Sequence, residues 1–216
     1  MNKQLEIPGT TKAGKGGQLS SLSAYDGSTT LSCFKTIVVD PPWAYGIWGS
    51  GSAKALVQGN ANKPAPLPYN SMTIDEIKSM PITKVAADNC ELYLWTTQRY
   101  LPISFDVLKA WGFKYCQTLI WCKKPRGTGQ GRVYCPTNEF LILGRKGKMP
   151  KIKRIDSTWW QIKRPHNSHS TKPEYFQDMI ETVSNEPRLE LFARRRRPGW
   201  YVWGNEVKSD INFGVI

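Results

Sequence analysis

Short apolar segments that are typical of buried strands alternate along this chain with segments of helical period. The first of them, Phe34–Val39, is rich in β-branched residues and ends at Asp40. We expect strands at residues 34–39, 91–95, 115–123, 139–144, 188–192 and 200–203. Strands that alternate with helices need crossover connections, so the pattern predicts an α/β fold whose mostly parallel sheet is flanked by helices.

Two Thr-x-x-Glu patterns predict the starts of helices. Thr73 is followed by Glu76, and Thr171 is followed by Glu174, which is the spacing of a capping box. The second pattern precedes four apolar residues that share one helical face, namely Phe176, Met179, Ile180 and Val183.

A third helix is expected between these two. Leu101, Phe105 and Leu108 follow each other at i, i+4 and i+7, which predicts the buried face of an amphipathic helix. Gly112 lies just beyond and is expected to end it.

The length of 216 residues is typical of one domain. Residues 1–30 are rich in Gly, Ser, Thr and Lys, so we expect a flexible arm there and a domain over residues 31–216. The apolar runs are too short for a membrane span, and no secretory signal opens the chain. The five cysteines contain no Cys-x-x-Cys pair, which disfavours zinc and a disulfide scaffold and indicates a cytoplasmic protein.

Positive charge is concentrated in one part of the chain. The net charge is +13, and residues 123–172 contain thirteen Lys or Arg against two acidic residues, Glu139 and Asp156. The segment and its border also carry Trp121, Tyr134, Trp159 and Trp160. A run of charged residues without aromatic ones would be explained by a solvated surface. Basic residues interleaved with aromatic ones favour nucleic-acid binding instead, and a neutral small substrate would need less charge.

The segment Asp40-Pro41-Pro42-Trp43 follows the first expected strand, at the carboxyl end where α/β sheets bind ligands. The exocyclic amine of adenine is a poor nucleophile unless two acceptors hold its N–H groups. Asp40 could accept one and the Pro41 carbonyl the other, because the prolines fix the backbone before a substrate arrives. Trp43 could stack on a flipped base. This segment contains no nucleophile, so the reaction would be a direct transfer from a bound donor.

A structural interpretation of these four residues is about equally good when they are taken alone. In it a Pro-Pro turn ends the strand, Asp40 caps the backbone and Trp43 lies in the core. His166 and His169 lack a third ligand at suitable spacing, so no metal site is expected.

Seven segments in a fixed order extend the pattern over nearly all of the chain from Phe34 to Val207. They are DPPW, PYNSMTIDEI, LYLWTT, TLIWCKKP, NEFLILGRKG, HSTKPEYF and LELFARRRRPGWYVWGNE. Together they resemble the DPPW-type adenine N6-methyltransferases, which include the catalytic subunit of the messenger-RNA adenosine methyltransferase and smaller bacterial and phage members. The resemblance implies a permuted Rossmann-like class I methyltransferase domain over residues 31–216, with S-adenosylmethionine as the methyl donor.

The resemblance also implies roles for the residues at matching positions. The catalytic segment would be Asp40, Pro41, Pro42 and Trp43, which would hold the target amine and contact the donor methionine. The further cofactor-binding residues would be Lys172 for the donor carboxylate, and Arg194, Asn205 and Glu206 for its ribose and adenine. The residues lining the acceptor pocket would be Tyr69, Trp121, Lys123 and Glu139.

The chain departs from the family pattern at several places. It has no Gly-x-Gly-x-x-Gly after a strand, and Glu206 stands where the messenger-RNA enzyme has Gln. The basic run 194–197 is longer than in that enzyme, so Arg194 is the preferred cofactor ligand. Arg194 to Arg197 could instead form a phosphate-contacting patch, and the two uses can coexist.

DNA is the preferred substrate, because the chain is small and lacks the RNA-recognition modules of the large eukaryotic enzyme. RNA is the close alternative. A catalytically silent nucleic-acid-binding subunit of a methyltransferase complex is a further alternative, against which the intact Asp40, Lys172 and Asn205 argue. The sequence leaves a homodimer or a partner subunit open and contains no readable code for a target sequence.

Overall fold

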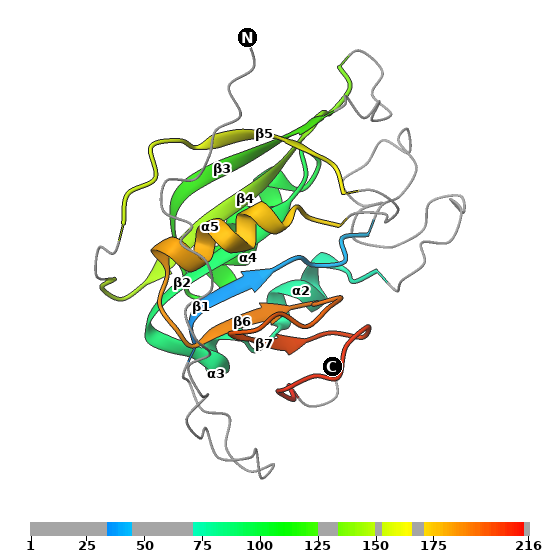
Figure 1. The fold of residues 1–216 in the computed structure, drawn as a ribbon. Helices are drawn as coiled ribbons and strands as arrows, with labels where there is room; N and C mark the ends of the chain where they lie inside the picture. The colour runs from blue at the N-terminus through cyan, green and yellow to red at the C-terminus, as the bar shows by residue number, and fades with distance from the viewer. Residues whose placement is uncertain (1–33, 45–70, 125–133, 150–152, 166–170, 214–216) are drawn as a thin grey trace.

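The computed structural model of the chain describes residues 34–44, 71–124, 134–149, 153–165 and 171–213. Within these residues, seven strands form one sheet with helices packed on both faces (Figure 1). The strands are β1 Phe34–Val39, β2 Ala86–Thr96, β3 Lys114–Lys124, β4 Asn138–Lys146, β5 Trp159–Lys163, β6 Arg188–Leu191 and β7 Trp200–Trp203. The helices are α2 Ile74–Ser79, α3 Ile82–Val85, α4 Leu101–Ala110 and α5 Glu174–Val183. The arm expected at residues 1–30 lies outside the described residues.

The direction of the strands brings their ends together. The strand order is β5-β3-β4-β2-β1-β6-β7, and four of the neighbouring pairs are parallel. Only β4 runs antiparallel to its neighbours, β2 and β3. The prediction of a mostly parallel α/β sheet is therefore confirmed. The carboxyl ends of the other strands and the amino end of β4 share one edge, called the carboxyl edge below, which is where such sheets bind ligands.

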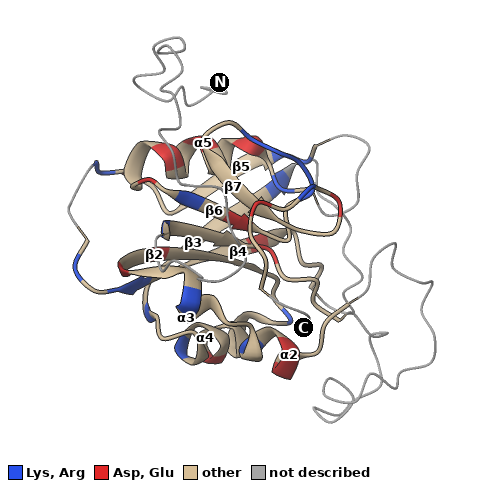
Figure 2. Ribbon diagram, turned by 90° about the horizontal axis from the view of Figure 1, so that it is seen from below, with Lys and Arg blue, Asp and Glu red and all other residues tan. Residues whose placement is uncertain are grey.

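Each face of the sheet has its own hydrophobic core. α5 covers one face, and α2, α3 and α4 cover the other (Figure 2). Along β1, Ile37 and Val39 pack into the core under α2 to α4, whereas Val38 packs into the core under α5 together with Phe176. By this alternation, Asp40 follows on the α5 side. None of the described helices is long and apolar enough to cross a membrane.

Two helix ends form as the sequence predicts. The Thr73 hydroxyl accepts the Glu76 N–H at 3.2 Å, and the Glu76 carboxylate accepts the Thr73 N–H at 2.6 Å, which completes the capping box of α2. Beyond α4, Gly112 adopts a φ of +78°, in the left-handed region that ends a helix and favours glycine. Both signals act between close neighbours in sequence, so the sequence alone is enough to reveal them.

The second capping box is wrong. The N-cap of α5 is Pro173, whose side chain makes no capping hydrogen bond. Thr171 lies two residues before the N-cap, so it does not hold the position that a capping box requires. The predicted apolar face is confirmed for Phe176, Met179 and Ile180, which are buried.

The buried face of α4 is rotated from the predicted one. Phe105 is 38% exposed and packs edge-on against Tyr115, with ring centroids 5.2 Å apart. Ser104 is fully buried in its place, and its hydroxyl donates to the Thr96 hydroxyl at 2.7 Å. Leu108 is buried as predicted. Ser104 is polar, so the apolar period does not mark it as a buried position. Its burial costs little because its hydroxyl has a hydrogen-bond partner.

Two elements are missing from the sequence prediction, the short helix α3 and the edge strand β5. β5 has the sequence WWQIK, in which Trp160 is buried while Trp159, Gln161 and Lys163 are exposed. It pairs in parallel with β3. Its position therefore depends on β3 and on the core under α5, which a five-residue pattern does not reveal.

Gly204 follows β7 at a point where two backbone segments approach closely. A Cβ on Gly204 would lie 2.3 Å from the Ala193 carbonyl oxygen and 2.8 Å from its nitrogen. These are backbone atoms, which cannot swing aside as a flexible side chain can. We expect Gly204→Ala to lower the free energy of unfolding by about 1–3 kcal/mol, as overpacking does. Urea unfolding measures this, and an unchanged midpoint would show that the two segments separate easily.

Candidate active site

The carboxyl edge of the sheet gathers most of the residues expected to form a site. Asp40 follows β1, Arg194 comes shortly after β6, and Asn205 and Glu206 follow β7. Glu139 lies near the amino end of β4, which reaches the same edge because β4 is antiparallel. The topology therefore explains why residues from both halves of the sequence converge here.

Four side chains at this edge alternate in charge and form what is called the charge chain below. The Lys172 ammonium lies 2.7 Å from an Asp40 carboxylate oxygen and 3.4 Å from a Glu139 oxygen. The Lys123 ammonium lies 2.6 Å from the other Glu139 oxygen. The side chains of Lys172 and Glu139 are only 14% and 10% exposed. Such burial is tolerated because each charge has an opposite partner.

The two ammonium groups of the charge chain each lie over a tryptophan ring. The Lys172 ammonium lies 5.5 Å from the Trp95 ring centroid, and the Lys123 ammonium lies 5.5 Å from that of Trp121. Trp121 is 2% exposed, and its indole N–H donates to the Ile162 carbonyl at 3.0 Å. The buried Trp121 ring therefore stabilises the position of the Lys123 ammonium. The resemblance implies that Trp121 lines an acceptor pocket. Its ring would have to become exposed to do so.

The ionisation of Asp40 depends on its neighbours in the charge chain. Burial raises the pKa of the Asp40 carboxyl above its ordinary value. The Lys172 ammonium opposes this rise through its charge and its hydrogen bond, while the Glu139 carboxylate adds to it. Any ligand that draws Lys172 away would therefore make Asp40 easier to protonate.

The Pro41-Pro42 turn is held by hydrogen bonds in addition to its stiff rings. The Trp43 N–H donates to the Pro41 carbonyl at 2.8 Å, and the Met72 N–H donates to the Pro42 carbonyl at 2.9 Å. Met72 and Trp43 also form an isolated parallel bridge. The Pro41 carbonyl keeps a second lone pair for a further donor.

Trp43 lies in the hydrophobic core, as in the structural interpretation of this segment. It is 3% exposed, and its indole N–H donates to the Trp95 carbonyl at 3.1 Å. Its ring stacks on the Tyr100 ring, with centroids 4.9 Å apart and planes 16° from parallel. The prediction that Trp43 stacks on a flipped base is therefore wrong, because the ring is enclosed. Trp43 anchors the turn that carries Asp40 and Pro41.

Tyr100 forms part of the site and was not predicted from the sequence. Besides stacking on Trp43, it donates a hydrogen bond from its hydroxyl to the Ala44 carbonyl. It is 1% exposed, and burial raises the pKa of its hydroxyl. As the N-cap residue of α4, it connects the turn to a helix start. The available signal is a tyrosine at a buried helix start, where its hydroxyl needs a partner.

Arg194 and Glu206 form a second group at the carboxyl edge. The Arg194 Nε lies 3.4 Å from a Glu206 carboxylate oxygen, and Asn205 beside it is exposed. Arg194 is also close enough to Asp40 to oppose the rise in the pKa of that carboxyl. The structure therefore brings together residues that the resemblance assigns to one cofactor.

The other arginines of the run 194–197 are paired with acidic residues of this chain. The ion pairs are Arg195–Glu174, Arg196–Asp210, Arg197–Asp178 and Arg197–Glu181. In Figure 2 the run is a blue stretch next to the red positions of α5. These pairs fasten the β6–β7 connection to α5 and to the segment after β7. A phosphate would have to compete with the carboxylates.

Several expected residues lie outside the described part of the chain. They are Tyr69, expected in the acceptor pocket, and His166 and His169, for which no metal site is expected. Among the residues that are described, no group of three or more His, Cys, Asp or Glu is arranged to hold a metal ion.

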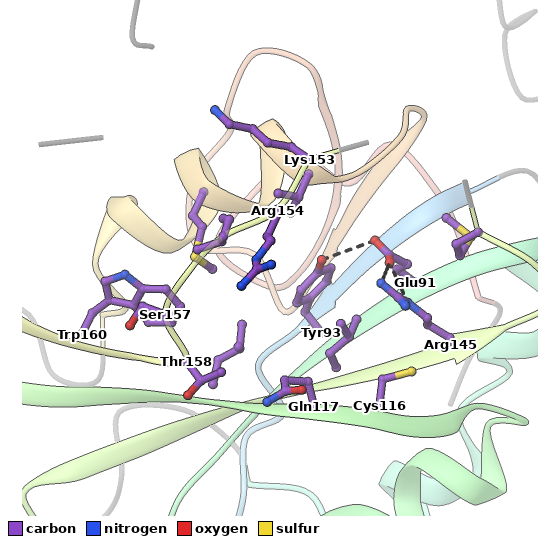
Figure 3. A pocket seen from close by; sticks show the side chains of 16 residues that line it. Glu91, Tyr93, Cys116, Gln117, Arg145, Lys153, Arg154, Ser157, Thr158 and Trp160 are labelled. Carbon is purple, nitrogen blue, oxygen red and sulfur yellow. Dashed lines mark hydrogen bonds and ion pairs between the residues drawn. The ribbon is translucent and has the colours of Figure 1, made fainter. Parts of the chain in front are cut away.

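A separate cavity of about 570 Å³ lies on the α5 face (Figure 3). Its lining residues Glu91 and Arg145 pair near the edge of the sheet opposite the carboxyl edge. The Glu91 carboxylate accepts a bond from Arg145 at 2.8 Å and from the Tyr93 hydroxyl at 3.4 Å. None of the expected site residues lines this cavity. The candidate active site is therefore the carboxyl edge and not the cavity.

Comparison with known proteins gives a consistent result. Residues 34–206 match the MT-A70 family. The chain is 27% identical over 186 residues to the Type II methyltransferase M.MunI of Mycoplasma sp, which covers 82% of this chain and 79% of that protein. It is 32% identical over 202 residues to the N(6)-adenine-specific methyltransferase METTL4 of Mus musculus, covering 82% of this chain and 39% of that one.

A third relative is the N(6)-adenosine-methyltransferase subunit METTL3 of Danio rerio. It is 28% identical over 187 residues, which cover 82% of this chain and 28% of the relative. The chain thus spans most of M.MunI but less than half of the two longer relatives.

The contacts of Tyr100 can be tested in two steps. Tyr100→Phe keeps the stack on Trp43 and loses the bond to Ala44, so we expect it to lower the free energy of unfolding by about 1 kcal/mol. Tyr100→Leu also loses the stack and should cost about 3 kcal/mol. Hydrogen exchange at the Met72 amide should become faster in both variants, more so in the second.

The control is Trp200→Phe, which removes an indole bond to the Glu181 carboxylate on the α5 face of the sheet. It should lower stability without selectively exposing the Met72 amide. Unchanged exchange at Met72 in Tyr100→Leu would show that Tyr100 does not hold the turn.

Proposed function

Because the chain belongs to the MT-A70 family, we propose that it is an S-adenosylmethionine-dependent methyltransferase acting on the N6 amine of adenine in DNA. The observation that carries the proposal is the position of Asp40. Its carboxylate lies at the carboxyl edge, beside a rigid Pro-Pro turn and against the Lys172 ammonium.

Asp40 and Pro41 supply the two acceptors that an adenine amine needs. Asp40 would accept one N–H, and the remaining lone pair of the Pro41 carbonyl would accept the other. The hydrogen bonds from Trp43 and Met72 hold the turn in place before substrate arrives. A preorganised pair of acceptors directs the nitrogen lone pair toward one point, at no reorganisation cost during the reaction.

The residues at the edge fit the chemistry of S-adenosylmethionine. Lys172 is a partly buried ammonium whose present partners are carboxylates, so it suits the donor carboxylate. Arg194, Asn205 and Glu206 follow β6 and β7 and offer both donors and acceptors for a ribose and an adenine. When bound, S-adenosylmethionine supplies an electrophilic methyl group on a sulfonium sulfur.

Within this arrangement, Asp40 positions the amine and lies where it can accept a proton from it. The amine becomes cationic and acidic when it gains the methyl group, so no strong base is required. Asp40 or a water molecule can take the proton. A pKa raised by burial makes Asp40 a better proton acceptor than an exposed aspartate.

The choice of DNA is supported by the comparison in length. The chain spans 79% of the Type II methyltransferase M.MunI, whereas it spans 28% of the adenosine methyltransferase subunit METTL3. RNA remains the alternative substrate, and the test below separates the two.

The test is methyl transfer by the purified chain from labelled S-adenosylmethionine. Duplex DNA, single-stranded DNA and RNA are each incubated separately, and nucleosides are analysed by mass spectrometry. We expect N6-methyladenine in DNA. Asp40→Asn keeps the shape of the side chain but not its charge, so it should lower the rate at least about 100-fold.

Each outcome has a distinct meaning. Methylation of RNA alone would move the proposed substrate to RNA. Near-normal turnover by Asp40→Asn would contradict the role given to Asp40. No transfer to any substrate, despite bound cofactor, would favour a binding subunit that activates a partner.

Lys172 should affect both the cofactor and the pH dependence. Lys172→Met removes a charge-assisted bond to the donor carboxylate, so calorimetry should show affinity weaker by about 10- to 100-fold. The variant also removes the ammonium that opposes the rise in the pKa of Asp40. The ionised Asp40 carboxylate accepts the N–H of the amine, and protonation weakens this acceptor. Activity is therefore lost as the pH falls through the pKa of Asp40. In Lys172→Met this loss should occur at higher pH.

Lys123→Met is the matched control, because Lys123 pairs with Glu139 and not with Asp40. It should shift the acid limb of the pH profile less. If Lys172→Met binds the cofactor with unchanged affinity and loses activity at the same acidic pH as the unchanged protein, Lys172 has neither role.

A further inference from the structure

The edge strand β5 begins with an unusually exposed tryptophan. Trp159 is 60% exposed, whereas Trp160 next to it is 7% exposed and packs into the core under α5. Alternation along the strand puts Trp159, Gln161 and Lys163 on the opposite face. Among the described residues, no other aromatic ring contacts Trp159. Exposing so much apolar surface costs free energy unless the residue has a partner.

The backbone around Trp159 is held firmly. The Ser157 hydroxyl donates to the Trp159 carbonyl at 2.7 Å and accepts the Trp159 N–H at 3.2 Å. The Ile120 N–H donates to the Thr158 carbonyl at 2.8 Å, which fixes the start of β5 to β3. The backbone that presents the indole is therefore ordered before any partner binds.

Positive charge at the other end of β5 is available for phosphates. Lys163 and Arg164 are exposed, and neither has a carboxylate partner within the part of the chain that the structure describes. The run 195–197 differs, since each of its arginines is paired with an acid. The basic residues of β5 are thus better suited to phosphates than those of the arginine run.

The carboxyl end of β5 borders the charge chain. Ile162 is in register with Lys123, and the Ile162 carbonyl accepts the Trp121 indole bond. Trp159 lies four residues before Lys163, about 13 Å along the strand at ~3.3 Å per residue. Lys163 and Arg164 therefore lie where β5 reaches the carboxyl edge, and Trp159 lies farther from this edge along the same strand. The side chains of Trp159 and Lys163 point to the face away from α5, so a bound strand would pass around the edge of the sheet at β5.

We propose that β5 binds the DNA strand next to the target adenine, with Lys163 and Arg164 on phosphates and Trp159 stacked on a neighbouring unpaired base. The inference rests on the proposed function and extends it to the binding surface. An enzyme that acts on a base must take that base out of the stack or use a single strand, and either leaves a neighbouring base face open. An exposed indole beside basic residues is the usual platform for such a base.

The test is equilibrium binding without methyl transfer. Fluorescence anisotropy of an end-labelled single-stranded oligothymidine measures the flanking surface, because this probe contains no adenine for the acceptor site. Trp159→Ala should weaken its binding roughly 5- to 100-fold. Trp159→Phe keeps a ring and should lose much less.

The charges have a separate signature. Replacement of Lys163 and Arg164 by Ala should weaken binding and lower the slope of log affinity against log salt by about one for each phosphate that is no longer bound. Two controls lie at the other end of β3 and on α4. Tyr115→Ala removes a 51% exposed aromatic residue, and Lys109→Ala removes an exposed cation. Both should bind the probe as the unchanged protein does.

The failures of the two proposals can be distinguished. If the protein methylates DNA but Trp159→Ala binds the probe normally, the β5 inference is overturned and the proposed function stands. If the unchanged protein binds no oligonucleotide and methylates none, both fall. If Trp159→Ala changes the sedimentation of the protein while its affinity for the probe stays constant, β5 is a protein contact and the inference is overturned.

Discussion

The carboxyl edge depends on one interaction, the placement of the Lys172 ammonium between two carboxylates. Lys172 precedes α5, Asp40 follows β1, and Glu139 lies at the start of β4. Removing a mostly buried ammonium from water is costly unless opposite charges accompany it. The ion pairs therefore tie three elements together and bring Asp40 into a partly dry environment. Because 132 positions separate Asp40 from Lys172, this environment exists only in the folded sheet.

The turn that follows Asp40 is rigid for reasons that its prolines only partly explain. Proline fixes φ, but the direction of each carbonyl also depends on its hydrogen-bond partners. Met72 binds the Pro42 carbonyl, and Tyr100 holds Trp43 and the Ala44 carbonyl. Three segments of the chain thus determine where Asp40 and Pro41 point. A substitution in any of them can disturb the acceptor geometry while leaving the four residues of the motif intact.

The features that could be predicted from sequence are those with local causes. β1 follows from a β-branched run, and the cap of α2 follows from Thr73 and Glu76. The failures have long-range causes. Trp43 has the composition of a stacking platform, yet the Trp95 carbonyl and the Tyr100 ring enclose it. β5 was missed because β3 and the core beneath α5 determine its position, and Tyr100 has no spacing that marks it as a site residue.

The distribution of charge shows why a net charge of +13 does not by itself identify a binding surface. In the sequence, residues 194–197 are four consecutive arginines. In the fold, α5 and the segment after β7 supply acids to Arg195, Arg196 and Arg197, so this charge holds elements together. Lys163 and Arg164 are only two residues, but folding brings no described carboxylate to them. The charge available to a phosphate is what remains after the fold has paired its own ions, and at β5 it remains beside an exposed indole.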